Sequence, residues 1–471
     1  MGSLKSKQPK AKQPKKRSVR SNKKQQDRPI IEANAAGIDV GAREMYVAIP
    51  PDRDAKPVRI FPTFTADLEE LADWLVERGI TTVAMESTGV YWIPLYQILE
   101  DHGIRPCLVN ARHMKNVPGR RTDWYECQWL QYLHSCGLLR AAFRPEQEVC
   151  AIRGLLRHRH QLVQMASQHV QHMQKALTQM NFQIQHVISD INGVTGTAIV
   201  DAILAGERDP AVLAKLRHER VAADEATLRK SLEGDWRKEH LFTLRQSRQL
   251  YDSYVKMIED CDKEIAPRLA QMEAKVDVSQ KPLPQLSGPS RKRRKKRTGD
   301  FRFDVRKQAY PLYGVDVTRI PGLDGLVIPL FSEVGRDLKA RFGTSDQFSS
   351  WLGLCTDNDK SAGKVLWQGV RKVKNRAGNI FRLAAAALHH SRSPLGDFLR
   401  RMKAKLGPAA GITATAHKIA IIFFTLVTKQ IEYDGSVWAA RDKEPHQRFE
   451  QKVKRQARQL GYELVPIQVP A

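Results

Sequence analysis

The sequence lacks the features of a disulfide-stabilised, zinc-binding or membrane protein. Its six cysteines are spread over 471 residues without a Cys-x-x-Cys pair, so neither a disulfide scaffold nor a zinc ribbon is expected, and the thiols fit a reducing cytosol. No apolar run approaches the roughly 18 residues of a membrane span, the longest being Ile419–Val427. The basic N-terminus has no apolar stretch behind it and does not read as a signal peptide.

Acidic residues are also few compared with basic ones. The chain has 77 Lys and Arg against 51 Asp and Glu, a formal net charge of +26 and a pI near 9.9. With 42% hydrophobic residues it can bury apolar cores, and at about 150 residues per domain its length suggests roughly three domains. Such a charge causes self-repulsion, which a polyanionic partner explains most simply. We therefore expect a cytosolic, multidomain nucleic-acid protein.

The first 32 residues predict a basic disordered arm. Residues 1–28 hold eleven Lys and Arg but a single acidic residue, Asp27, and such a segment cannot bury enough apolar surface to fold. It could serve only to keep the protein soluble, or it could contact phosphates and release their counterions. The charge of the whole chain favours phosphate contact.

Residues 33–145 alternate between strand-like and helix-like patterns. A three-strand meander followed by alternating helices and strands predicts a mixed sheet with helices on its faces, the α/β part of an α/β plus all-α protein. The predicted strands are Ala35–Val40, Met45–Ile49, Val58–Phe61, Thr82–Glu86 and Pro106–Val109; the predicted helices are Leu68–Glu77, Tyr91–Asp101 and one from near Thr122 through Leu133.

Residues 146–279 carry two apolar seams with alternating spacings of three and four. The first runs from Ile152 to Ile191 and is interrupted by Arg159; the second runs from Leu241 to Val276 and is interrupted by Arg248 and Asp262. Two such seams predict an antiparallel helical hairpin or a dimerising coiled coil, with residues 192–239 at the tip. An ordinary helical-bundle core fits the same pattern.

A linker and a last domain follow. Residues 280–303 are rich in Pro, Ser and Gly around a basic run that resembles a nuclear-localisation patch, although a phosphate-contacting loop is the simpler interpretation. Residues 304–435 predict a mostly helical domain, and residues 436–471 a polar tail. The aromatic residues after the basic run could stack on unpaired bases or begin the core of the last domain. The basic run is Arg291, Lys292, Arg293, Arg294, Lys295, Lys296 and Arg297; the aromatic residues are Phe301, Phe303, Tyr310 and Tyr313.

Four carboxylates stand at positions that could form one metal site. Asp39 ends the first predicted strand, between Gly37 and Gly41, and such glycines let a ligand approach the backbone closely. Glu86 ends a later strand, and neighbouring parallel strands would place both carboxylates at one sheet edge. Asp123 and Glu126 share a face of the next helix. Clustered carboxylates repel one another unless divalent cations neutralise them, and oxygen ligands suit Mg²⁺ or Mn²⁺.

Three motifs of this region resemble a known family. Gly-Ile-Asp-Val-Gly around Asp39, Met-Glu-Ser-Thr-Gly-Val-Tyr-Trp around Glu86, and Arg-Thr-Asp-Trp-Tyr-Glu-Cys-Gln-Trp-Leu from Arg121 are similar to the RuvC-like (RNase H-like) domain of DEDD-type insertion-sequence transposases, the bridge-RNA-guided serine recombinases. That family usually has Asp three residues after the third carboxylate, where this chain has Glu126.

The resemblance continues in the last domain. Ile320-Pro321-Gly322-Leu323-Asp324-Gly325 looks like the family's helix-hairpin-helix turn, in which Gly322 and Gly325 would let backbone N–H groups approach phosphates. Downstream, Leu352-Gly353-Leu354 and Lys360-Ser361-Ala362-Gly363-Lys364 match the family's spacing around its nucleophilic serine, so Ser361 takes that role and Lys360 or Lys364 would steady phosphate charge. Thr356 stands where the family often has Pro. A basic cluster follows, either a solvated face or a phosphate-tracking stripe, of which the net charge favours the stripe: Arg371, Lys372, Lys374 and Arg376.

The resemblance implies a complete activity. Two Mg²⁺ or Mn²⁺ ions would bind Asp39, Glu86, Asp123 and Glu126, and Ser361 would form a covalent phosphoserine with DNA. A structured bridge RNA would pair with donor and target DNA as the guide. The family works as tetramers with composite sites, for which the apolar seams would be natural dimer contacts. The setting would be the prokaryotic cytoplasm, at the nucleoid, with no membrane partner.

Two other functions fit the same residues. A metal-dependent nuclease or junction resolvase would hydrolyse DNA with activated water and leave Ser361 structural. A nucleic-acid scaffold would have carboxylates that no longer bind metal. Trapping of the protein on a cleavable DNA substrate separates these alternatives from a transposase.

Overall fold

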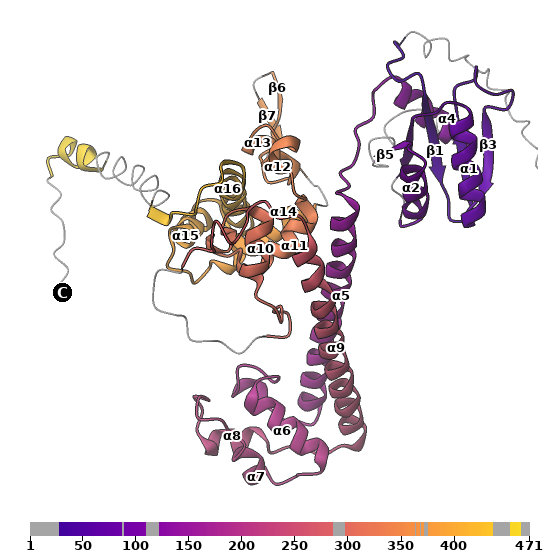
Figure 1. Cartoon of the computed structure of the whole chain (residues 1–471). Coiled ribbons are helices and arrows are strands. Elements are labelled where there is room, and N and C mark those ends of the chain that lie inside the picture. The colour runs from indigo at the N-terminus through magenta and orange to yellow at the C-terminus, as the bar shows by residue number, and fades with distance from the viewer. Residues whose placement is uncertain are drawn as a thin grey trace, which may run out of the picture. The chain divides into compact units, whose positions relative to one another are not determined.

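The chain divides into two compact units, residues 1–144 and 145–471, which are described separately (Figure 1). The computed structural model describes residues 28–86, 89–109, 122–285, 297–362, 364–367, 369–371, 375–436 and 453–462. Most of the predicted N-terminal arm, the basic run up to Lys296, and Lys372 and Lys374 lie outside the described residues.

The first unit is built on a five-stranded mixed sheet. Its spatial order is β3-β2-β1-β4-β5, in which β1 pairs antiparallel with β2 and parallel with β4. The β2–β3 pair is antiparallel and the β4–β5 pair is parallel. The predicted mixed sheet is therefore confirmed. The strands are β1 (Ala35–Val40), β2 (Glu44–Ala48), β3 (Val58–Pro62), β4 (Thr82–Glu86) and β5 (Arg105–Val109).

Helices cover both faces of this sheet. One core contains Leu71 of α1 (Thr65–Glu77) and Leu99 of α2 (Trp92–Asp101), packed with strand residues such as Ile38. A smaller core joins Ala84 of β4 to Leu130 of α4 (Asp123–Ser135). Because successive side chains of a strand point to opposite faces, the two cores lie on opposite sides of the sheet.

Gly37 explains how closely α4 approaches the sheet. A Cβ atom at Gly37 would lie 2.2 Å from the backbone nitrogen of Gln131 and 2.4 Å from the carbonyl oxygen of Cys127. The space beside this glycine is therefore filled by α4 and is not open to a ligand, which corrects the sequence interpretation. Gly41 similarly faces the carbonyl oxygen of Glu44 across the turn from β1 to β2.

The second unit begins with two long helices, α5 (Gln147–Gln179) and α9 (Lys238–Gln271), which pack side by side (Figure 1). Arg159 contacts Asp262, and His169 stacks on Tyr254, so the two helices run antiparallel within one chain. Short helices form the tip between them: η1 (Ile184–His186), α6 (Val194–Ala205), α7 (Pro210–Ala214) and α8 (Glu225–Ser231).

The first apolar seam was predicted to continue too far along the chain. Helix α5 ends at Gln179, and Asn181 takes a left-handed conformation with φ 60°, which an L-residue does not adopt inside a helix. Ile184 and Ile191 of the predicted seam are nevertheless buried, in the tip. The seam residues on both helices lie in the core of a single chain. This arrangement is the predicted hairpin, and it covers the seam residues.

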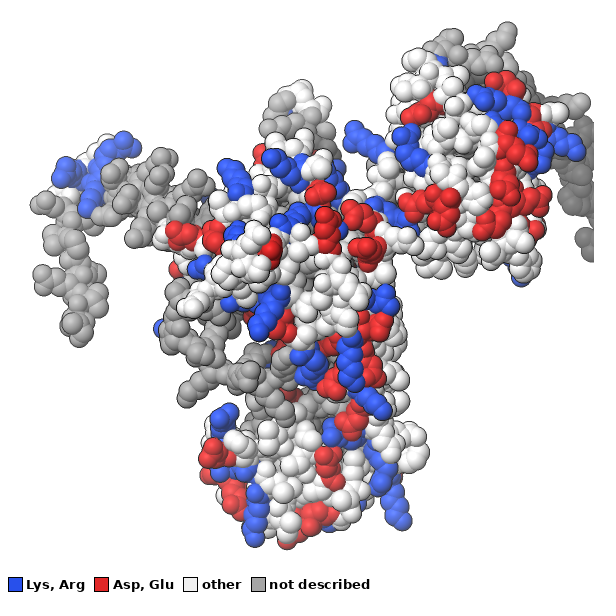
Figure 2. Space-filling model, viewed as in Figure 1, with Lys and Arg blue, Asp and Glu red and all other residues white. Residues whose placement is uncertain are grey.

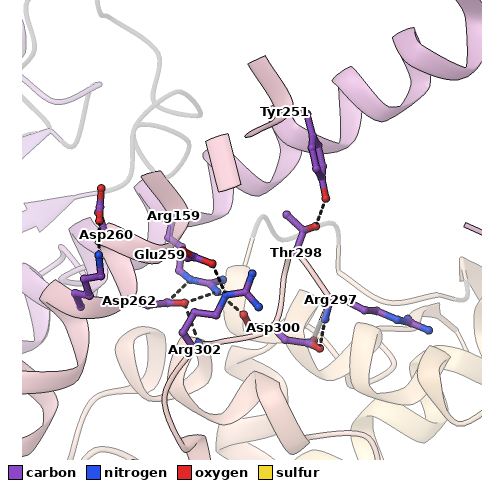
Figure 3. Close-up of polar contacts among 10 residues, drawn as sticks. Arg159, Tyr251, Glu259, Asp260, Asp262, Arg297, Thr298, Asp300 and Arg302 are labelled. Carbon is purple, nitrogen blue, oxygen red and sulfur yellow. Dashed lines mark hydrogen bonds and ion pairs between the residues drawn. The ribbon is translucent and has the colours of Figure 1, made fainter. Parts of the chain in front are cut away.

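Two of the three polar interruptions of the seams, Arg159 and Asp262, bind each other (Figure 3). Arg159 donates from Nε and Nη2 to the two carboxylate oxygens of Asp262, at 2.6 and 3.1 Å, and both side chains are buried. Arg159 also donates to the carbonyl oxygen of Gly299 at 3.1 Å and lies 4.1 Å from the ring of Phe301. The backbone N–H of Arg302 donates to Asp262 at 3.0 Å. The pair therefore fixes the segment that follows the basic run.

The rest of the second unit is mostly helical. Its core holds Tyr313, Phe331, Phe348 and Phe423 in mutual ring contacts, and it is continuous with that of the hairpin. Tyr310 and Phe301 are also buried, so the core interpretation of these aromatic residues holds. The elements are α10 (Val305–Tyr313), η2 (Val317–Arg319), η3 (Asp324–Leu326), α11 (Val327–Val334), α12 (Leu338–Arg341), α13 (Ser345–Trp351), β6 (Asp359–Ser361), β7 (Lys364–Trp367), α14 (Arg376–Ala387), α15 (Pro394–Leu406) and α16 (Pro408–Lys429).

Helix α16 is long and apolar enough to cross a membrane by length and composition, and it is the one described helix that is. More than half of its apolar window is buried inside the fold, with Ile419, Phe423 and Val427 in the core. Core helices pass the same length and composition test.

Candidate functional site

Three of the four predicted carboxylates meet at one edge of the sheet in the first unit. Asp39 and Glu86 lie at the carboxyl ends of the parallel strands β1 and β4, and Glu126 lies in the first turn of α4. One carboxylate oxygen from each of the three lies within 4.8 Å of the others. Glu86 is buried, while Asp39 and Glu126 are half-buried. The neighbouring strands and the close packing of α4 on Gly37 place them together.

Asp123 lies near this cluster but is not one of its three members. It is the exposed first residue of α4, where a carboxylate is stabilised by the positive end of the helix dipole. Burial, with the negative charges of Asp39 and Asp123 nearby, raises the pKa of the Cys127 thiol to about 12. Asp123 is therefore close enough to add its charge to that of Asp39.

Tyr46 is a neighbour of the cluster that the sequence analysis did not single out. It pairs with Asp39 across β1 and β2, and its hydroxyl donates to Glu44 at 3.1 Å. That hydrogen bond raises the pKa of Tyr46, with further contributions from burial and from the charges of Glu44, Asp123 and Asp39. The predicted strand pair could have identified Tyr46, because its short turn fixes which residue faces Asp39.

The donor set fits a divalent cation of the magnesium type. Mg²⁺ binds oxygen ligands at about 2.0–2.1 Å in an octahedron, so two ligands of one ion lie at most roughly 4.2 Å apart. The three oxygens lie within 4.8 Å of one another, a spacing that one ion with a small side-chain movement, or a pair of ions about 4 Å apart, accommodates. Three carboxylates at this spacing also repel one another, and a bound cation removes that repulsion. Asp39, Glu86 and Glu126 are therefore the residues suited to hold such an ion.

Ser361 is displayed at the end of a β-hairpin in the second unit. Strands β6 and β7 pair antiparallel with Ser361 opposite Lys364, and Ala362 takes a left-handed conformation with φ 47° at the turn. Ser361 is exposed, and within the described part of the chain no hydrogen-bond partner is recorded for its hydroxyl. An aliphatic hydroxyl needs a base or a metal to become a strong nucleophile. A nucleophilic role for Ser361 would therefore require a base or a metal beyond its described surroundings.

Helix α14 holds the base of this hairpin in place. The side-chain amide of Asn375 donates to the carbonyl oxygen of Trp351 at 2.9 Å, and Arg382 donates to that of Gly353 at 2.8 Å. Gly378 packs so closely that a Cβ there would lie 2.3 Å from the carbonyl oxygen of Leu352. These contacts attach the Leu-Gly-Leu motif, and with it the base of the hairpin, to α14. The hairpin projects from the helices (Figure 1).

The residues predicted to contact nucleic acid fall into different environments. Gly322 has φ 90°, and a Cβ there would lie 2.3 Å from the carbonyl oxygen of Ala384, so the packing of α14 explains this glycine. Gly325 is exposed, and the turn joins two 3₁₀ segments. Arg371 donates to Ser350 at 2.6 Å. The exposed basic residues of the prediction are Lys364, Arg371, Arg376 and Arg297, and Lys360 lies in β6.

A family model identifies the region that contains the three carboxylates. Residues 36–182 match the transposase model of the IS110 family of DEDD-type transposases. The chain carries a DEDD-type transposase domain. This domain supports an enzyme that acts on DNA in transposition. No curated protein matches the chain.

The matched range covers the sheet of the first unit and continues to Phe182, just beyond the end of α5. It includes Asp39, Glu86 and Glu126, and it ends well before Ser361. The DEDD-type domain suggests a divalent metal, in agreement with the acidic cluster.

Proposed function

We propose that the transposase cleaves and rejoins DNA through a covalent phosphoserine at Ser361. The observation that carries the proposal is the exposure of this hydroxyl at a hairpin turn, beside Lys364, in a protein whose other unit gathers three carboxylates at a sheet edge. A hydroxyl displayed in this way is accessible to a DNA phosphate. A bound divalent cation would supply charge neutralisation at the phosphate oxygens.

In the cleavage step, the Oγ of Ser361 bonds to phosphorus while the bond from phosphorus to a deoxyribose oxygen breaks. The serine proton leaves to a base, and the departing sugar oxygen takes up a proton. In the joining step a deoxyribose hydroxyl attacks the phosphoserine, and the serine regains its proton. One phosphodiester replaces another in each step, so no outside energy source is required.

The proposal extends to the partners that the sequence implies. Donor and target DNA would be chosen by base pairing to a structured guide RNA, while a basic protein holds the nucleic-acid backbones. The net charge of +26 supports backbone binding. The protein would act as a homo-oligomer, up to a tetramer, at the nucleoid. Because α5 and α9 bury their seams against each other, contacts between subunits would use other surfaces, which revises the expectation that these seams join subunits.

Adduct trapping on a DNA substrate tests the chemistry. With Mg²⁺ and the cognate RNA present, we expect wild-type protein to form a denaturation-resistant adduct with DNA, and Ser361→Ala to form none. Ser253→Ala is the matched control, because Ser253 is an exposed serine on α9 and should leave the adduct unchanged. Cleavage without an adduct would instead indicate a nuclease that uses water. Absence of cleavage under these conditions would indicate a scaffold.

The RNA requirement has its own test. Omitting the RNA should remove the adduct but leave general DNA binding. Equal adduct yield without any RNA would contradict the guided mechanism and leave the phosphoserine step in place.

A further inference from the structure

The β6–β7 hairpin presents two large apolar side chains to solvent. Leu366 is 70% exposed and Trp367 is 42% exposed, and both follow Lys364, the strand partner of Ser361. The hairpin is a two-stranded sheet that no third strand joins within the described residues, and it projects from the helices (Figure 1). A single exposed leucine is ordinary on a protein surface, but here the backbone around the two side chains is specialised as well.

A β-bulge sets the position of Leu366. Lys360 pairs with Val365, whereas Asp359 pairs with Trp367, so β7 has one more residue than β6 over this step and Leu366 is the extra one. A bulge bends its strand and re-aims a side chain, and bulges are frequent beside active sites. Only one residue pair separates this bulge from the pair that contains the predicted nucleophile.

Trp367 lies against the backbone next to this bulge. A Cβ atom at Gly369 would lie 2.6 Å from Cζ2 of the Trp367 ring, so the indole occupies space that only a glycine leaves open. The carbonyl oxygen of Gly369 accepts from the backbone N–H of Asp357 at 2.7 Å, and Thr356 forms a bridge with Val370. The indole therefore rests on a backbone segment that is tied to the residues before β6, and this limits the movement of the bulge.

The charge around these apolar side chains matches a nucleic acid. Residues 360–376 have six Lys and Arg and no Asp or Glu. The side chains of Lys364, Arg371 and Arg376 are exposed, although Arg371 also lies 3.9 Å from Asp357. By contrast, α1 and α2 of the first unit hold seven Asp and Glu and no Lys or Arg, and red side chains gather over these helices in Figure 2. DNA offers both an anionic backbone and the apolar faces of its bases, which an apolar protein surface does not.

We infer that Leu366, supported by Trp367, separates two stacked base pairs of the DNA duplex beside the phosphate that Ser361 attacks. DNA is the occupant because the transposase domain supports an enzyme that acts on DNA, and the place of the duplex rests on the proposed phosphoserine function. Two residues of a strand cover about 7 Å, so Leu366 lies roughly two base steps of 3.4 Å from Lys364. Apolar side chains inserted at a base step unstack it and kink the duplex, and strand exchange requires such bases to part.

Fluorescence of 2-aminopurine, which base stacking quenches, measures this opening directly. A duplex that spans one end of the mobile element carries the base at successive positions, and the full-length protein binds it with Mg²⁺ and the cognate RNA. We expect a rise at one step with Ser361→Ala, which forms no adduct, and the loss of that rise when Leu366→Ser is added. Positions that the RNA opens by base pairing should keep their signal in both variants.

The rate of adduct formation is the second readout. Leu366→Ser should lower this rate on a fully paired duplex by at least roughly tenfold, because the cost of unstacking one step is no longer offset. A mismatch placed at that step should restore the rate. Leu383→Ser is the matched control, since Leu383 is a 58% exposed leucine on α14 and should change neither readout. Leu366→Met keeps an apolar side chain of similar size and should behave like wild type.

Three results would overturn the inference. The first is an unchanged fluorescence rise with Leu366→Ser, and the second is an equal loss with Leu383→Ser. The third is a change in oligomeric state, measured by light scattering, that accompanies the loss and shows that Leu366 contacts a second copy of the chain. Failure of the proposed function is distinguishable, because wild-type protein would then give a rise that depends on Leu366 but no adduct.

Discussion

Each unit holds one group of buried or half-buried charges. The acidic cluster of the first unit contains charges of one sign, whereas the Arg159–Asp262 pair of the second unit contains charges of opposite sign. Asp39, Glu86 and Glu126 bring like charges within 4.8 Å, an arrangement that repels itself and favours an added cation. Arg159 and Asp262 are complementary, and their hydrogen bonds extend to the backbone of residues 299–302. A cluster of like charges therefore indicates a ligand site, whereas an ion pair of opposite charges stabilises the fold.

The largest expected effect is on catalysis by the acidic cluster. Asp39→Asn should lower DNA cleavage by at least about a hundredfold, because metal neutralisation contributes several kcal/mol and each 1.4 kcal/mol is tenfold in rate. Without metal, the free energy of unfolding should not fall, because one of three repelling charges is removed. Cleavage assays with Mg²⁺ and denaturant unfolding without it measure the two quantities.

Glu70→Gln is the control for this variant, since Glu70 is an exposed carboxylate on α1 and should change neither quantity. Full cleavage by Asp39→Asn would contradict the metal assignment.

The next effect is on stability in the hairpin. Arg159→Met leaves the buried Asp262 carboxylate without its partner and should lower the free energy of unfolding by about 3–5 kcal/mol. The double variant Arg159→Met with Asp262→Leu should recover most of that loss, because apolar side chains replace both charges. Denaturant unfolding measures both, and a single variant as stable as wild type would show that the pair contributes little.

The smallest expected effect is on the pH dependence of stability, and it comes from the buried hydrogen bond between Thr82 and His134. The hydroxyl of Thr82 donates to the carbonyl oxygen of Arg105 at 2.9 Å and so accepts from Nε2 of His134, also at 2.9 Å. Burial lowers the pKa of His134 below its ordinary value of 6.5. The unfolded chain therefore takes up a proton first, and stability is lost as pH falls from above 6.5 toward the lowered folded value.

His134→Gln keeps a donor for Thr82 but cannot titrate, so the decline in unfolding midpoint between neutral and mildly acidic pH should become shallower. The comparison is with wild type at matched ionic strength. An identical pH profile for the two proteins would rule out His134 as a source of the decline.

The strands and helices of the first unit could be predicted from sequence because each has a clear period and a bounding turn. All are present, with ends within three residues of the predicted ones. The meeting of Asp39 with Glu86 followed from two neighbouring parallel strands. The exclusion of Asp123 from the group could not be predicted, because Asp123 and Glu126 share a helix face and only the docking of α4 decides which of them points into the cluster.

The helical hairpin of α5 and α9 also shows which contacts could not be predicted from the sequence. The sequence revealed Arg159 and Asp262 as interruptions in two seams but left open whether the seams pack on each other or on another subunit. The segment after the basic run could not be placed either, because its contacts are mostly backbone carbonyl and N–H groups, which every residue has.

Local composition by itself determined the charge, the periodicity of each segment and the chemical type of the site, because these depend on side chains and their spacing along the chain. Tertiary structure decided which distant groups became neighbours: Glu126 beside Asp39, Arg159 beside Asp262, and Lys403 beside His389. The physical reason is that charge interactions depend on separation and burial, and both are set only when helices dock on strands and on one another.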